Sequence, residues 1–135
     1  MLIVWILIVL VALLAIIFFS YYNRFSVLSN RIDNSLSQID VQLKRRTDLI
    51  PNLIESVKGY MKHEKAAIQA VTEARKALLG AKDVAKRVKA DNQLESALKT
   101  IFALAENYPD LKANTNFLEL QKELTATEDR VAYSR

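Results

Sequence analysis

The chain contains no cysteine, one histidine, two glycines and two prolines among its 135 residues. Without cysteine it can form neither a disulfide bond nor a thiolate metal site. So few glycines and prolines, in a chain rich in alanine, leucine, lysine and glutamate, favour a protein that is almost entirely helical. The composition therefore predicts an all-α fold.

The side chains that usually carry chemistry are also scarce. His63 is the single histidine, and Glu64 follows it. Helical di-iron sites need two Glu-x-x-His pairs, and zinc proteases need two histidines one helical turn apart. Glu119 and Glu123 have the ordinary spacing of an exposed helix face. We therefore expect no catalytic residue, no cofactor and no metal site.

Charges of both signs are interspersed: 19 Lys and Arg stand against 15 Asp and Glu, which gives a net charge of +4. This mild excess argues only weakly for anionic partners. The densest positive cluster is Lys44, Arg45 and Arg46. Nearby acidic residues dilute it and no nucleic-acid-binding module is present, so we expect no nucleic-acid partner.

A long apolar run begins the chain, and residues 1–19 contain no charged residue. A helix over residues 2–22 would be about 30 Å long, the thickness of a bilayer's hydrocarbon core. A cleaved signal peptide would need a basic start, a shorter apolar run and a small-residue cleavage site. We predict a transmembrane helix over residues 1–22. Its aromatic interfacial anchors are Trp5, Phe18, Phe19, Tyr21 and Tyr22.

The orientation follows from the flanking charges. Only the amino terminus precedes the span, whereas Arg24 and Arg31 follow it. Because cytoplasmic flanks carry the excess of Lys and Arg, we expect a single-pass protein of the cell membrane. Its N-terminus would lie outside and its soluble domain in the cytoplasm.

An apolar stripe continues through residues 23–36, which we interpret as a helical stalk. The stripe consists of Phe25, Leu28, Ile32 and Leu36. An apolar stripe that lies before the bundle favours self-association. The span itself has no pair of small residues four apart, so tight pairing inside the bilayer is not indicated. The stalk therefore predicts a homo-oligomer.

Residues 37–135 predict an antiparallel, up-down helical bundle. The first stripe has spacings of three, four and seven, typical of a bundle seam, and comprises Ile39, Leu43, Ile50, Leu53 or Ile54, and Val57. Pro51 is expected to kink or interrupt this helix. The chain could reverse either there or at Gly59.

Three further helices follow in this interpretation. The second covers residues 62–79, and the basic run 82–90 is a connector or an extra solvated turn. Asp91 caps the third helix, which ends at Pro109. Asn116 and Glu119 form a capping box for the fourth. The inward residues of the three are Ala67, Val71, Ala74 and Leu78; Leu94, Leu98, Ile101, Ala105 and Tyr108; and Phe117, Leu120, Leu124 and Val131.

Two segments are candidates for partner contact. Residues 107–116 are rich in Asn, Asp and Pro, which suits either an ordinary connection or a docking loop. The basic cluster suits either a solvated helix face or an acidic partner, possibly a neighbouring copy. Lipid contact is disfavoured because Arg45 lies about 35 Å beyond the span along a straight helix. The candidate contact residues are Lys44, Arg45, Arg46, Tyr108, Asp110, Asn114 and Asn116.

Several blocks resemble the bacterial LemA family: IDVQLKRRTDLIPNLIESVKGY, then HEK and VTEAR, then AENYPDLKANTNFLELQKEL and TEDR. The resemblance implies a single N-terminal membrane helix followed by an antiparallel helical bundle. A magnetosome membrane protein belongs to the same family. The family has no established enzymatic activity, so it supplies no catalytic residues. Its members usually continue past the TEDR-like block, so this chain either lacks a tail or is a short member.

Together these features predict a membrane-tethered, non-enzymatic scaffold that binds proteins, including itself. Its expected partners are the lipid bilayer, further copies of the chain and an unknown membrane protein. An alternative is a regulatory or adaptor subunit of a membrane protease or signalling complex. A carrier of a small ligand or metal is a third class, and it would need a buried polar pocket.

Overall fold

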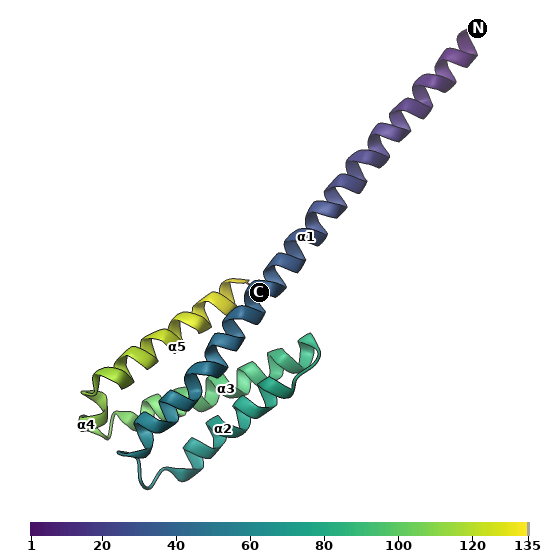
Figure 1. Cartoon of the computed structure of the whole chain (residues 1–135). Coiled ribbons are helices and arrows are strands. Elements are labelled where there is room, and N and C mark those ends of the chain that lie inside the picture. The colour runs from purple at the N-terminus through teal and green to yellow at the C-terminus, as the bar shows by residue number, and fades with distance from the viewer. Residues whose placement is uncertain (135) are drawn as a thin grey trace. The chain divides into compact units, whose positions relative to one another are not determined.

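The computed structural model describes residues 1–134, and over these residues the secondary structure is helical, with no strand. The elements are α1 (Leu2–Lys58), α2 (Lys65–Gly80), α3 (Val84–Ala105), α4 (Pro109–Lys112) and α5 (Thr115–Ser134) (Figure 1). The predicted all-α fold class is confirmed.

The chain divides into two compact units, Met1–Ser37 and Gln38–Arg135. The first unit consists of the N-terminal part of α1, and nearly all of its side chains are exposed. The second unit contains the rest of α1 and the other helices, which alternate in direction (Figure 1).

One hydrophobic core holds the second unit together, and the predicted stripes supply it. Burying a large apolar side chain contributes about 1.5–3 kcal/mol, so this shared core is the main source of stability. The predicted residues that are buried are Leu43, Ile50, Leu53 and Val57 of α1; Val71, Ala74 and Leu78 of α2; Leu94, Leu98, Ile101 and Ala105 of α3; and Phe117, Leu124 and Val131 of α5. The prediction that these residues form the buried faces of their helices is confirmed.

The first helix continues through Pro51 and ends at Lys58. The prediction that Pro51 interrupts it is therefore wrong. The chain leaves the helix at Gly59, where the amides of Tyr60 and Met61 both bind the Val57 carbonyl. Of the two candidate points of reversal, the structure selects the one near Gly59.

The third helix begins earlier than predicted. Asp83 is its N-cap, and its Oδ1 accepts a hydrogen bond from the amide of Lys86 at 2.8 Å. Asp91 does not cap the helix but lies buried within it. Residues 84–90 are not a connector either, because they form the first turns of α3, and Ala90 packs into the core.

The fourth predicted helix also begins slightly earlier. Asn114 Oδ1 accepts from the amide of Phe117 at 3.1 Å, so Asn114 caps α5 and the predicted capping box of Asn116 and Glu119 is wrong. Pro109 opens the short helix α4, in which Leu111 is fully buried. The third helix ends before it, at Ala105.

Candidate interaction surfaces and a buried ion network

The first unit supplies an apolar helical surface. Within residues 1–134, the N-terminal part of α1 is the single stretch long and apolar enough to cross a membrane. This is compatible with a single-pass membrane protein. The predicted anchors Trp5, Phe18, Phe19, Tyr21 and Tyr22 are all exposed, and the rings of Phe18 and Tyr22 stack with their centroids 6.5 Å apart.

The stalk stripe, defined as Phe25, Leu28, Ile32 and Leu36, is also open to solvent. The exposed fractions of these side chains are 75%, 50%, 59% and 38% in that order. Within the first unit, the stripe is therefore largely open. A partner that covered it would remove a substantial apolar area from water.

The three residues of the basic cluster lie in different environments. Lys44 is exposed and pairs with Asp48 on the same helix at 3.4 Å. Arg45 pairs with Glu123 of α5 at 3.5 Å. Arg46 is 1% exposed, so it belongs neither to a solvated face nor to a partner-contact surface. The interpretation of the cluster as one surface is wrong for Arg46.

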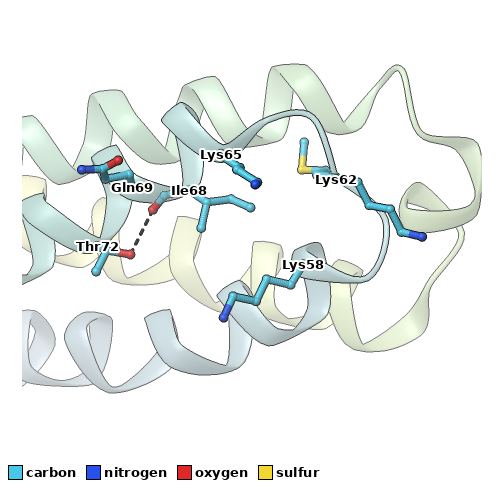
Figure 2. A pocket seen from close by; sticks show the side chains of 7 residues that line it. Lys58, Lys62, Lys65, Ile68, Gln69 and Thr72 are labelled. Carbon is cyan, nitrogen blue, oxygen red and sulfur yellow. Dashed lines mark hydrogen bonds between the residues drawn. The ribbon is translucent and has the colours of Figure 1, made fainter.

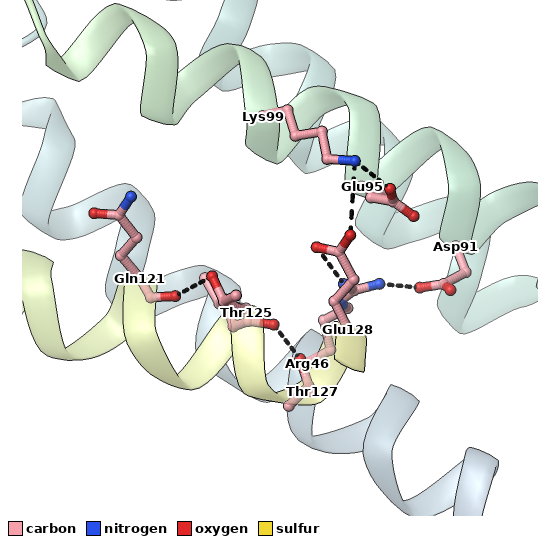
Figure 3. Close-up of polar contacts among 9 residues, drawn as sticks. Arg46, Asp91, Glu95, Lys99, Gln121, Thr125, Thr127 and Glu128 are labelled. Atoms are coloured by element: carbon pink, nitrogen blue, oxygen red, sulfur yellow. Dashed lines mark hydrogen bonds and ion pairs between the residues drawn. The ribbon is translucent and has the colours of Figure 1, made fainter. Parts of the chain in front are cut away.

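Arg46 instead forms the centre of a buried ion network that joins α1, α3 and α5 (Figure 3). Its Nη1 donates to Asp91 Oδ1 at 2.5 Å, and its Nη2 lies 3.7 Å from Glu128 Oε2. Lys99 Nζ lies 2.5 Å from Glu95 Oε1 and 3.6 Å from Glu128 Oε1. The network therefore fixes how three helices pack at one level of the bundle.

The pKa values of the two glutamates in the network are shifted in opposite directions. Burial raises the pKa of Glu128, and the neighbouring charge of Glu95 raises it further. A hydrogen bond from Lys99 is the main cause of the lowered pKa of Glu95. Two carboxylates side by side disfavour double ionisation, so the pair holds a proton more readily on Glu128.

The sequence contained a signal for this network that its interpretation missed. Arg46 continues the seam of α1, since Leu43, Arg46, Ile50 and Leu53 have spacings of three, four and three. Asp91 likewise continues the apolar stripe of α3, because it lies one helical turn before Leu94. Charged residues on the buried seams of separate helices suggest mutual pairing, because a buried charge needs a partner.

The network has no evident catalytic use. Among the described residues, no group of three His, Asp or Glu side chains is placed to hold a metal ion. Arg46 pairs with Asp91 and Glu128 across helices, and Lys99 pairs with Glu128 across helices and with Glu95 within α3. The charges of the network are therefore compensated inside the fold.

The residues predicted at the turn before α5 divide between structural and exposed positions. The Tyr108 hydroxyl donates to Glu64 Oε1 at 3.5 Å, and burial is the main cause of its raised pKa. Asn114 caps α5, and its Nδ2 donates to the hydroxyl of Tyr60 at 3.4 Å. Asp110 and Asn116 are exposed. The structure thus gives Tyr108 and Asn114 a role within the fold.

A feature that the sequence analysis missed is a groove beside the turn from α1 to α2, with a volume of about 610 Å³ (Figure 2). We call it the lysine groove; it is lined by Lys58, Met61, Lys62, Lys65, Ile68, Gln69 and Thr72. No acidic residue lines it. Its three lysines lie within residues 58–65, at the end of α1, in the turn and at the start of α2, and the sequence shows the charges but not the hollow that they line.

Comparison with known proteins places the chain in a family. The profile of the LemA family matches residues 35–135. Protein LemA of Metamycoplasma hominis is similar, with 29% identity over 122 residues. That match covers 87% of this chain and 56% of the relative, so the chain spans about half the length of the curated relative it matches. The chain belongs to the LemA family.

Proposed function

We propose that this chain is a membrane-anchored, non-enzymatic scaffold that self-associates and binds other proteins at the bacterial inner membrane. The observation that carries the proposal is the exposed stalk stripe, which directly follows an apolar segment long enough to cross a bilayer. A stripe of large apolar side chains is the kind of surface that another helix covers.

The energetic argument favours a second copy as that helix. Full burial of each large side chain of the stripe would contribute about 1.5–3 kcal/mol, and packing against a partner would recover part of this. Copies anchored in one bilayer also meet at a raised effective concentration, which favours association without further contacts. The stripe has the spacing of a coiled-coil seam, so two stalks could pack along it.

A structural role also fits the chemistry of the bundle. The most buried charged side chains, Arg46 and Asp91, bind one another. The single histidine, His63, is exposed and lies in the turn before α2. These features support a protein that works by contact. We accordingly propose a single-pass position in the cell membrane with the bundle on the cytoplasmic side.

The proposal is tested by the double substitution Leu28→Ser and Ile32→Ser in the full-length chain. Mass measurement after size-exclusion chromatography in detergent should show wild-type oligomers and a smaller species for the double variant. The matched control is Ser26→Ala with Asn30→Ala, on the opposite side of the same stalk, which should leave the mass unchanged.

Thermal unfolding separates self-association from intramolecular packing. If the double variant keeps the wild-type mass but unfolds at a lower temperature, the stripe is covered within one chain and self-association through the stalk is wrong. If mass and unfolding temperature are both unchanged, the stripe makes no contact at all and the proposal fails in the same way.

A further inference from the structure

We propose that the lysine groove binds an acidic amphipathic helix of a partner protein. This inference rests on the proposed function, since it names the chemistry of a partner for the scaffold. It uses a surface of the bundle, however, and makes no use of the stalk stripe.

The first argument is charge. Lys58, Lys62 and Lys65 line the groove, and within the described part of the chain none of them forms an ion pair. Glu64, the acidic residue beside them in the sequence, is engaged by the Tyr108 hydroxyl on the other side of the turn. Three ammonium groups around one hollow attract carboxylates and repel basic partners.

The second argument is the start of α2. Asp83 and Asn114 cap the helices that follow them, but Glu64 makes no side-chain hydrogen bond to the first turn of α2. The backbone amides at that end therefore add a partial positive charge close to the lysines. This adds to the preference for an anionic occupant.

The third argument is shape. The lining residues of α2 are Lys65, Ile68, Gln69 and Thr72, which have the spacing i, i+3, i+4 and i+7 and so form one continuous helix face. Met61, which is 1% exposed, and Ile68, which is half-buried and packs against the core, are the apolar residues of the lining. Lysine side chains have apolar stems that can cover such surface and ammonium groups that stay in water.

These features together define the occupant. A helix laid in the groove would place apolar side chains on Ile68 and the stems of the lysines and acidic side chains against their ammonium groups. Apolar contact at the centre with charge at the rim is the usual anatomy of a protein interface. An isolated anion would leave Ile68 and the apolar stems of the lysines uncovered, so the groove favours an amphipathic segment.

The test uses the full-length chain in nanodiscs of zwitterionic lipid and a fluorescent synthetic peptide. The peptide has about 18 residues, long enough for about five helical turns, with leucine on one face and glutamate elsewhere. Fluorescence anisotropy should show saturable binding that weakens with salt. A peptide with lysine in place of glutamate should not bind, and one with serine in place of leucine should bind more weakly.

The groove variant is Lys58→Glu with Lys62→Glu, and it should bind the acidic peptide about tenfold more weakly or worse. The matched control is Lys82→Glu with Lys89→Glu, which changes the net charge equally at exposed lysines outside the groove. This control should bind like the wild type. If the groove variant does not fold, Lys58→Gln with Lys62→Gln replaces it.

Two results would overturn the proposal. Absent peptide binding, or equal weakening in the groove variant and its control, would show that the groove does not select the peptide. If vesicles rich in phosphatidylglycerol bind the wild type through the groove lysines while the peptide does not bind, the occupant is a lipid surface. The assembly mass of the same samples reports on the stalk independently, so failure of the groove and failure of self-association remain distinguishable.

Discussion

Arg75 donates a hydrogen bond from its Nε to the backbone carbonyl oxygen of Thr47 at 2.9 Å. In an α-helix that carbonyl binds the amide four residues later, but here the fourth residue is Pro51, which has no amide hydrogen. The guanidinium of α2 therefore takes the place of the missing donor in α1. This contact accounts for a helix that passes through proline, and it ties α1 to α2.

Substituting Arg75 should show how much this contact contributes to the stability of α1. Arg75→Met keeps an unbranched stem but removes the donor, so we expect a loss of about 1–3 kcal/mol in the free energy of unfolding. Denaturant unfolding followed by circular dichroism would measure it.

A double-mutant cycle identifies the cause. In a Pro51→Ala background the amide of residue 51 can bind the Thr47 carbonyl, so Arg75→Met should cost clearly less there. An equal loss in both backgrounds would mean that Arg75 stabilises the bundle by packing and does not replace the missing amide.

Removing one partner of the buried pair of Arg46 and Asp91 should strongly destabilise the fold, whereas replacing both partners by apolar residues should change its stability little. Asp91→Ala removes the closest anion from a buried guanidinium, which should lower the free energy of unfolding by about 3–5 kcal/mol. Replacing both partners, as Arg46→Met with Asp91→Leu, should restore most of that stability.

The exposed pair of Lys44 and Asp48 supplies the control. Asp48→Ala should change the same free energy by less than about 1 kcal/mol, because solvent screens that pair. If Asp91→Ala had an effect as small as Asp48→Ala, the network would not set the packing of the helices.

The two glutamates should give opposite pH dependences. The folded-state pKa of Glu128 is raised, so its contribution to stability grows as the pH falls and is lost as the pH rises through that pKa. The folded-state pKa of Glu95 is lowered, so its contribution is present above the usual carboxyl range and is lost on acidification. We therefore expect Glu128→Gln to be near neutral or slightly stabilising at pH 7, and Glu95→Gln to be destabilising.

Unfolding curves recorded from neutral pH to about pH 3 test these signs, since an unperturbed glutamate titrates at about pH 4.3. The change due to Glu128 should fall above that value and the change due to Glu95 below it. The stability of the wild type relative to Glu128→Gln should increase on acidification, and its stability relative to Glu95→Gln should decrease. The same direction of change for both variants would contradict the assignment of the shared proton to Glu128.

The absence of cysteine makes the proposed sidedness in the membrane simple to measure. Lys82 is exposed between α2 and α3, so Lys82→Cys introduces one accessible thiol into an otherwise thiol-free chain. If the bundle is cytoplasmic, a membrane-impermeant maleimide should label it only after spheroplasts are lysed. Labelling of intact spheroplasts would place the bundle outside, against the indication of Arg24 and Arg31.

The core of the fold could be predicted from the sequence because it depends on the helical spacing of apolar residues. The spacing of Leu43, Ile50 and Val57 places them on one face whatever the partner helices are, and all are buried. The helix starts were harder to predict. Asp83 and Asp91 are both acceptable caps in isolation, and only the burial of Asp91 beside Arg46 shows which of them begins α3.

The candidate surfaces depended on contacts between distant residues, which one sequence does not reveal. Arg46 was assigned to a surface cluster because it follows Lys44 and Arg45 directly in the sequence, which forms the densest run of positive charge. Pro51 looked like a break because its compensating donor, Arg75, lies on another helix. The stalk stripe was visible in the sequence because it is local, and whether a partner covers it stays a prediction.

The buried network also bears on the order of events during synthesis. Arg46 lies on the first helix, Asp91 on the third and Glu128 on the last, so no local stretch of chain can complete the set. Helices and the hairpin of α2 and α3 can form early because their contacts are close in sequence. The guanidinium of Arg46 gains its full set of anions only when α5 has been made. While the last helix is still being synthesised the bundle is unfinished, and the part of the apolar seam of α1 that α5 covers stays exposed.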